Sequence, residues 1–153
     1  NIKTFTDASD STSAAINSVT STGAVLSDLE MTDQPLMKAQ GDFFDSRAAV
    51  TREQIAYSMV QALGLQSEAE AFGSGNIIAV VLGEAVEVED TADIAPELRG
   101  YVQQALAAGL MQVEVTVEQG PFDFEPTLKA FFNPDNKVTR GEAAFIVTQF
   151  AER

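Results

Sequence analysis

The 153-residue chain contains no histidine, no cysteine and no tryptophan. Without an imidazole or a thiol it cannot form a Ser-His-Asp triad, a Cys-His pair or a thiolate zinc site. The absence of cysteine also excludes a disulfide, which is compatible both with a reducing compartment and with an exported protein. We therefore expect a protein that is not an enzyme and that holds no cofactor and no metal.

Positive charge and long apolar runs are also scarce. Nine Lys and Arg residues stand against 23 Asp and Glu, so the formal net charge of -14 repels phosphate and argues against nucleic acid as a partner. The longest apolar run, residues 77–82, is too short for a membrane span, which needs about 20 residues. A chain of this length and apolar content still buries enough surface to form a core.

The sequence repeats itself with two offsets. At an offset of 86 residues the aligned pairs are Asp7 with Asp93, Ile16 with Val102, Val19 with Ala105, and Gly23 with Gly109. At an offset of 88 they are Phe43-Phe44 with Phe131-Phe132, Val50-Thr51-Arg52 with Val138-Thr139-Arg140, and Gln61 with Gln149. This pattern predicts a first module over residues 1–65, an acidic linker over 66–90 and a second module over 91–153.

Each module contains a helix that begins at a Thr-Arg pair. Thr51 with Gln54 and Thr139 with Glu142 have the spacing of a capping box, in which the hydroxyl and the later side chain satisfy two backbone N–H groups. Capping fully explains these four residues. Apolar residues then recur at helical spacing, and in the second module the predicted buried face is Ala143, Val147 and Ala151, widened by Ile146 and Phe150.

The two arginines need a further explanation. Arg52 and Arg140 follow the cap, where a cation opposes the positive end of the helix dipole by about 0.3–1 kcal/mol. One explanation is a structural salt bridge to Asp7 or Asp93, whose positions also repeat. The other is an acidic ligand bound by the guanidinium and the helix amides together. The sequence leaves both open.

The remaining segments predict less regular structure. Residues 11–22 and 96–109 read as the first helix of each module, and Gly109-Leu110 as a helix stop. Residues 77–88 predict a tight hairpin, and residues 111–118 alternate at period two before a turn at Gly120-Pro121. We expect the two Phe pairs to fill the core beneath the capped helices, and the acidic linker to be solvated.

The repeated motifs resemble the S-layer homology domain. Its modules open with Phe-x-Asp, as at Phe5-Thr6-Asp7, and close with a Phe-x-Pro and Thr-Arg-Ala-Glu segment. Phe132-Asn133-Pro134 and Val138-Thr139-Arg140-Gly141-Glu142 match that closing segment closely, and Val50-Thr51-Arg52-Glu53-Gln54 matches it in part. The resemblance covers about four fifths of the chain, although two modules are visible where the family usually has three.

The resemblance implies a mainly α fold, with two helical repeats packed as a bundle and short β-hairpins in the connecting segments. It also implies a secreted or cell-surface protein that binds an acidic, pyruvylated envelope polysaccharide through Arg52 and Arg140. The alternative is a structural accessory domain without carbohydrate binding. Similar two-module tails follow the catalytic domain of some secreted subtilisin-like proteases, so a parent catalytic domain is a candidate partner.

Overall fold

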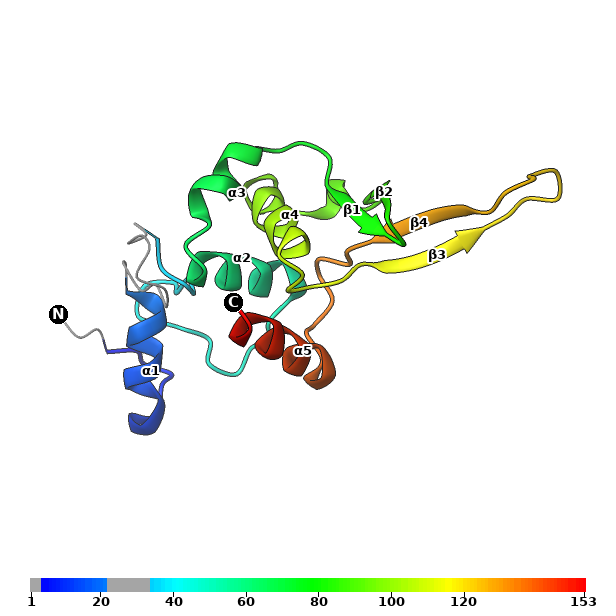
Figure 1. Cartoon of the computed structure of the whole chain (residues 1–153). Helices are drawn as coiled ribbons and strands as arrows, with labels where there is room; N and C mark the ends of the chain where they lie inside the picture. Colours follow the sequence, from blue (N-terminus) through cyan, green and yellow to red (C-terminus); the bar gives the residue numbers. More distant parts are fainter. Residues whose placement is uncertain (1–3, 22–33) are drawn as a thin grey trace.

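The computed structural model describes residues 4–21 and 34–153 (Figure 1). Its α-helices are α1 (Asp10–Thr20), α2 (Arg52–Ala62), α3 (Gln66–Phe72), α4 (Arg99–Ala107) and α5 (Arg140–Ala151). Two 3-10 turns, η1 (Thr91–Asp93) and η2 (Pro96–Leu98), precede α4. Four strands form two antiparallel hairpins: β1 (Ile78–Val81) with β2 (Glu84–Glu87), and β3 (Glu114–Glu118) with β4 (Thr127–Phe131).

The prediction of a mainly helical bundle is wrong. Helices account for 41% of the described residues and strands for 17%, so the fold is mixed α and β. The hairpins are integral to the packed fold, because β1 packs on α4 and β2 packs on β4. Helix α1 does not join a bundle either: within residues 4–21 and 34–153 it adds no residue to the hydrophobic core of the other helices, and the N–H of Met37 donates to its Val19 carbonyl at 2.9 Å.

One hydrophobic core is shared by both modules and the segment between them. Its fully buried members include Val60 of α2, Ile77 before β1, Val102 of α4 and Ile146 of α5. The 66–90 segment, expected to be a solvated linker, contributes helix α3 and the first hairpin, while its glutamates remain exposed. The expectation of solvation therefore holds for its glutamates and fails for its apolar residues.

Helices α3 and α4 approach each other closely at one glycine. A Cβ atom added to Gly100 would lie 1.7 Å from the backbone oxygen of Ala69, so only glycine permits this separation. The contact brings the buried face of α4, including Tyr101 and Val102, against the core.

Local turn chemistry follows the sequence. The first hairpin turns at Leu82 and Gly83, whose φ angles of 52° and 86° suit a tight two-residue turn. Gly109 adopts a φ of 71°, and the N–H groups of Gly109 and Leu110 donate to Leu106 and Ala105. This is the expected Schellman stop of α4.

Two predictions about burial need correction. Phe132 is fully buried, but Phe43 is 49% exposed because the loop that carries it lies at the edge of the molecule. In α5 the predicted face is only partly buried: Ala143, Val147 and Ala151 are exposed, whereas Ile146 is buried and Phe150 packs against the core, as predicted. Helix α5 therefore contacts the core along a narrow line, in contrast to α2.

Among residues 4–21 and 34–153, no helix has the length and apolarity of a membrane span.

Candidate functional site

The beginnings of α2 and α5 lie side by side. Thr51 forms an antiparallel bridge with Lys137, and the N–H of Val138 donates to the carbonyl of Val50 at 3.0 Å. The N–H of Arg52 donates to the carbonyl of Asn136 at 2.9 Å. The two repeated segments, 50–54 and 134–142, thus form one site at the junction of the modules.

The capping prediction is confirmed at α2 and only in part at α5. The Thr51 hydroxyl accepts from the N–H of Gln54, and the Gln54 side chain accepts from the N–H of Thr51, which completes the capping box. At α5 the Thr139 hydroxyl accepts from the N–H of Glu142 at 3.1 Å. The Glu142 carboxylate does not return to the cap, because it pairs with Arg52.

Arg52 crosses from the first module into the second. Its Nε donates to the carbonyl of Phe132 at 2.7 Å, and its Nη2 donates to the carbonyl of Gln112 at 2.6 Å. Its Nη1 forms a salt bridge with Glu142, and the guanidinium lies 4.8 Å from the centre of the Phe132 ring. All three guanidinium nitrogens therefore have partners, and both side chains are largely buried, at 13% and 19% exposed for Arg52 and Glu142.

Burial lowers the pKa of Arg52, and the negative charges of Asp90 and Glu114 oppose that shift. The group stays charged at neutral pH, because an arginine titrates far above it. A charged and largely buried arginine needs the partners that it has here. Asp7 and Asp93, the candidate partners from the sequence, form no salt bridge with Arg52, and Glu142 takes that place.

Arg140 holds the equivalent position in the second module but a different environment. It is exposed at the first turn of α5, and the described parts of the chain give it no hydrogen bond or ion pair. The repeat in sequence is therefore not a repeat in contacts. Arg52 has the second module beside it, whereas no described segment covers Arg140 in the same way.

Two aspartates hold the Phe-containing loops. The Asp7 carboxylate accepts from the N–H groups of Phe44 at 3.0 Å and Ser46 at 2.9 Å, and these bonds lower its pKa. Asp90 holds the corresponding loop of the second module by accepting from the N–H groups of Phe132 at 2.8 Å and Asn133 at 2.7 Å. Asp90 is therefore the counterpart of Asp7.

The proposed counterpart in sequence, Asp93, is exposed, and its carboxylate makes no hydrogen bond within the described residues. The missed signal is an apolar-x-Asp pattern, Phe5-Thr6-Asp7 against Val88-Glu89-Asp90, at an offset of 83. Phe5 and Val88 are both buried, as this alignment requires.

The loops held by these aspartates have the same backbone conformation. Asp45 and Asn133, 88 positions apart, are both left-handed, with φ angles of 62° and 56°. Each begins a turn closed by a hydrogen bond three residues on, from Ala48 to Asp45 at 2.9 Å and from Asn136 to Asn133 at 3.1 Å. The repeat is therefore visible in three dimensions at this loop.

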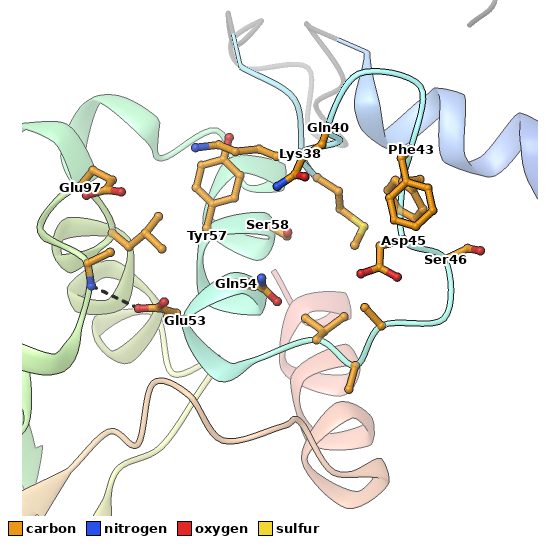
Figure 2. A pocket seen from close by; sticks show the side chains of 17 residues that line it. Lys38, Gln40, Phe43, Asp45, Ser46, Glu53, Gln54, Tyr57, Ser58 and Glu97 are labelled. Carbon is orange, nitrogen blue, oxygen red and sulfur yellow. Dashed lines mark hydrogen bonds between the residues drawn. The ribbon is translucent and has the colours of Figure 1, made fainter. Parts of the chain in front are cut away.

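A groove of about 600 Å³ lies between α2, η2 and the 37–50 loop (Figure 2). Its described lining includes the carboxylates of Asp45, Glu53 and Glu97, with Lys38 as the one cation among them. The Lys38 ammonium lies 4.9 Å from the Tyr57 ring centre. Such a lining favours a neutral or positively charged occupant over an anion.

The Glu53 carboxyl is perturbed by its place in this groove. Partial burial raises its pKa, the N–H of Ala95 opposes the shift by donating to Oε2 at 3.3 Å, and Asp135 and Glu97 raise the pKa further. Figure 2 shows this hydrogen bond at the η2 side of the groove. Sequence reasoning missed Glu53, because its environment comes from segments more than 40 positions away.

Comparison with known proteins adds no relative. No family model, no curated protein and no solved structure matches the chain.

Proposed function

We propose that this chain is a non-catalytic accessory domain of a larger exported protein, in which two modules resembling S-layer homology repeats form a scaffold for contact with another protein. In this proposal the Arg52 side chain connects the first module to the second by internal contacts and does not bind sugar. The observation that carries it is the full set of partners around the Arg52 guanidinium.

Displacement of those partners would be costly. An acidic sugar at Arg52 would have to replace the Glu142 carboxylate and the carbonyls of Phe132 and Gln112. The Phe132 carbonyl and the Glu142 carboxylate would then lose their donor in a largely buried place, and leaving such groups unsatisfied costs about 1–3 kcal/mol each. The acidic lining of the neighbouring groove also disfavours a polyanion.

The test compares Arg52→Lys with Arg140→Lys as a matched control. Lysine keeps the charge but cannot reproduce three directed contacts, so we expect Arg52→Lys to lower the free energy of unfolding by about 2–4 kcal/mol. Arg140→Lys should change it by less than about 0.5 kcal/mol, because Arg140 is exposed. Urea unfolding followed by circular dichroism gives both values.

The unchanged protein, Arg52→Lys and Arg140→Lys are then each mixed with purified pyruvylated cell-wall polysaccharide and sedimented. We expect no cosedimentation that depends on Arg52. If the unchanged protein cosediments, and Arg52→Lys abolishes this while the unfolding curve stays the same, Arg52 is a sugar-binding residue and the proposal fails.

Attachment to an acidic envelope polysaccharide remains the second candidate, now through Arg140. It is favoured by the exposure of Arg140 and by its lack of a partner in the described parts of the chain. Cosedimentation that is lost in Arg140→Ala and kept in Arg52→Lys would favour it.

A further inference from the structure

The β3–β4 hairpin carries apolar side chains into solvent. Figure 1 shows it extending away from the helices. All five residues of β3 are exposed, including Val115 and Val117 on one face. At the tip, Phe122 and Phe124 are 92% and 101% exposed. These side chains contribute nothing to the core of this chain, although their alternation along β3 is that of a strand with one covered face.

The hairpin is firmly mounted at its base. The N–H of Glu89 donates to the carbonyl of Ala130 at 2.8 Å, and Val88 bridges the same residue. Ala130 and Phe132 are both fully buried. The exposed part is therefore held by β4, which enters the core directly.

The tip is also ordered by its own hydrogen bonds. Asp123 accepts from the N–H of Gly120 at 2.8 Å through its carboxylate and returns its own N–H to the Gly120 carbonyl at 3.1 Å. The Gln119 side chain donates to the Asp123 carbonyl at 3.1 Å. Pro121 fixes a further backbone angle within this turn. A rigid aromatic tip loses little conformational freedom on binding.

Charge selects the kind of partner. The hairpin carries the acids Glu114, Glu118, Asp123 and Glu125, against Lys129, which is already paired with Glu118 at 3.0 Å. The acidic groups disfavour an anionic membrane surface. A second copy of the chain is disfavoured as well, because its net charge is -14 and its described groove is lined by three carboxylates. A basic surface with an apolar pocket complements both features of the hairpin.

We propose that the β3–β4 hairpin is the contact element of this domain, and that Phe122 and Phe124 enter an apolar pocket bordered by Lys or Arg on a different protein. This inference rests on the proposed function, since it assumes that the domain works by contact with another protein. Large aromatic residues with a polar border are the usual centres of such interfaces.

The partner is identified first in the native cells. The photoreactive residue p-benzoylphenylalanine replaces Phe124 in one strain and Val147 in a control strain, because Val147 is an exposed apolar residue of α5. We expect one protein to cross-link from position 124 and not from position 147. The absence of any such product would overturn the proposal.

Affinity for the purified partner then tests the chemistry. We expect the double variant Phe122→Ser, Phe124→Ser to weaken binding by about tenfold or more, while Val147→Ser leaves it unchanged. Glu125→Gln should slow association by about two- to fivefold at low salt, in contrast to Glu84→Gln at the β1–β2 turn. The substituted side chains are all exposed, so the thermal unfolding of each variant should match that of the unchanged protein.

Three further results would overturn the inference. They are unchanged affinity in the double Phe variant, a tip-dependent dimer of this chain in sedimentation equilibrium, and tip-dependent binding to phosphatidylcholine vesicles. None of these bears on Arg52, so the hairpin proposal can fail while the accessory-domain proposal stands. Conversely, sugar binding through Arg52 would overturn the proposed function without altering the hairpin measurements.

Discussion

At the scale of single residues, the aspartates that hold the Phe loops test the register of the repeat. Asp90 accepts two backbone N–H groups, whereas Asp93 is exposed. In Asp90→Asn one carboxylate oxygen becomes an NH2 group that faces a backbone donor. We expect a loss of about 1–3 kcal/mol in the free energy of unfolding, from urea curves.

Asp93→Asn is the matched control for this change. It removes the same charge three positions away, and we expect an effect within about 0.5 kcal/mol. Equal losses in the two variants would contradict the assignment of Asp90 as the counterpart of Asp7.

Glu53 gives a prediction about pH. Its pKa is higher in the folded protein than its ordinary value of 4.5, so the folded state holds this proton more tightly than the unfolded state. Protonated Glu53 therefore favours folding at low pH, and this contribution is lost as the pH rises through the folded pKa. We expect Glu53→Gln to raise the melting temperature at pH 7 and to reduce its dependence on pH above 4.5, the ordinary pKa of the group.

The control removes one carboxylate elsewhere. Glu84→Gln at the exposed β1–β2 turn changes the net charge equally, so the difference between the two variants isolates the environment of Glu53. Identical melting profiles in calorimetry would show that the groove does not perturb this carboxyl.

At the scale of elements, the packing of α3 on α4 depends on one glycine. Because a Cβ at Gly100 would overlap the backbone of Ala69, we expect Gly100→Ala to destabilise the protein by about 2–4 kcal/mol. Gly141 in α5 has open space around its Cβ position. Gly141→Ala should therefore stabilise by up to about 1 kcal/mol, since alanine favours the helix. Thermal unfolding of both variants checks this, and a mild effect at Gly100 would contradict the close approach.

Local rules predicted the elements that depend on neighbouring residues. The capped start of α2, the Gly109 stop and the turn of the first hairpin follow from a few adjacent side chains. Helix α3 was missed, because its sequence, Gln66–Phe72, has little apolar periodicity and is stabilised by its contact with α4. The strand pattern of β3 was correct, but nothing in it indicates that the hairpin would leave the core.

Partner choice across the chain could not be predicted. Glu142 has a complete local explanation as a cap, so the sequence gives no reason to assign it to a residue 90 positions earlier. The alignment of Asp7 with Asp93 failed for a related reason: a fixed offset hid the three-residue shift to Asp90. Both errors concern contacts between distant segments. The chemistry of the neighbouring residues does not distinguish the partner that is chosen from the others that could be chosen.

At the scale of the whole molecule, α2 of the first module, the segment between the modules and the second module share one core, so we expect these parts to unfold together. Ala56 of α2, Ala69 of α3 and Ala105 of α4 are all buried in it. Arg52 adds hydrogen bonds between the modules at the point where their Thr-Arg segments meet. In this view the second Thr-Arg segment serves the first by supplying Glu142.

The most direct measurement is a double-mutant cycle in the free energy of unfolding, built from Arg52→Gln, Glu142→Gln and the double variant. If Arg52 and Glu142 form the internal tie between modules, the two changes are coupled by about 1–3 kcal/mol. A coupling below about 0.5 kcal/mol would mean that the two side chains act independently. It would contradict the proposal that Arg52 joins the two modules through Glu142.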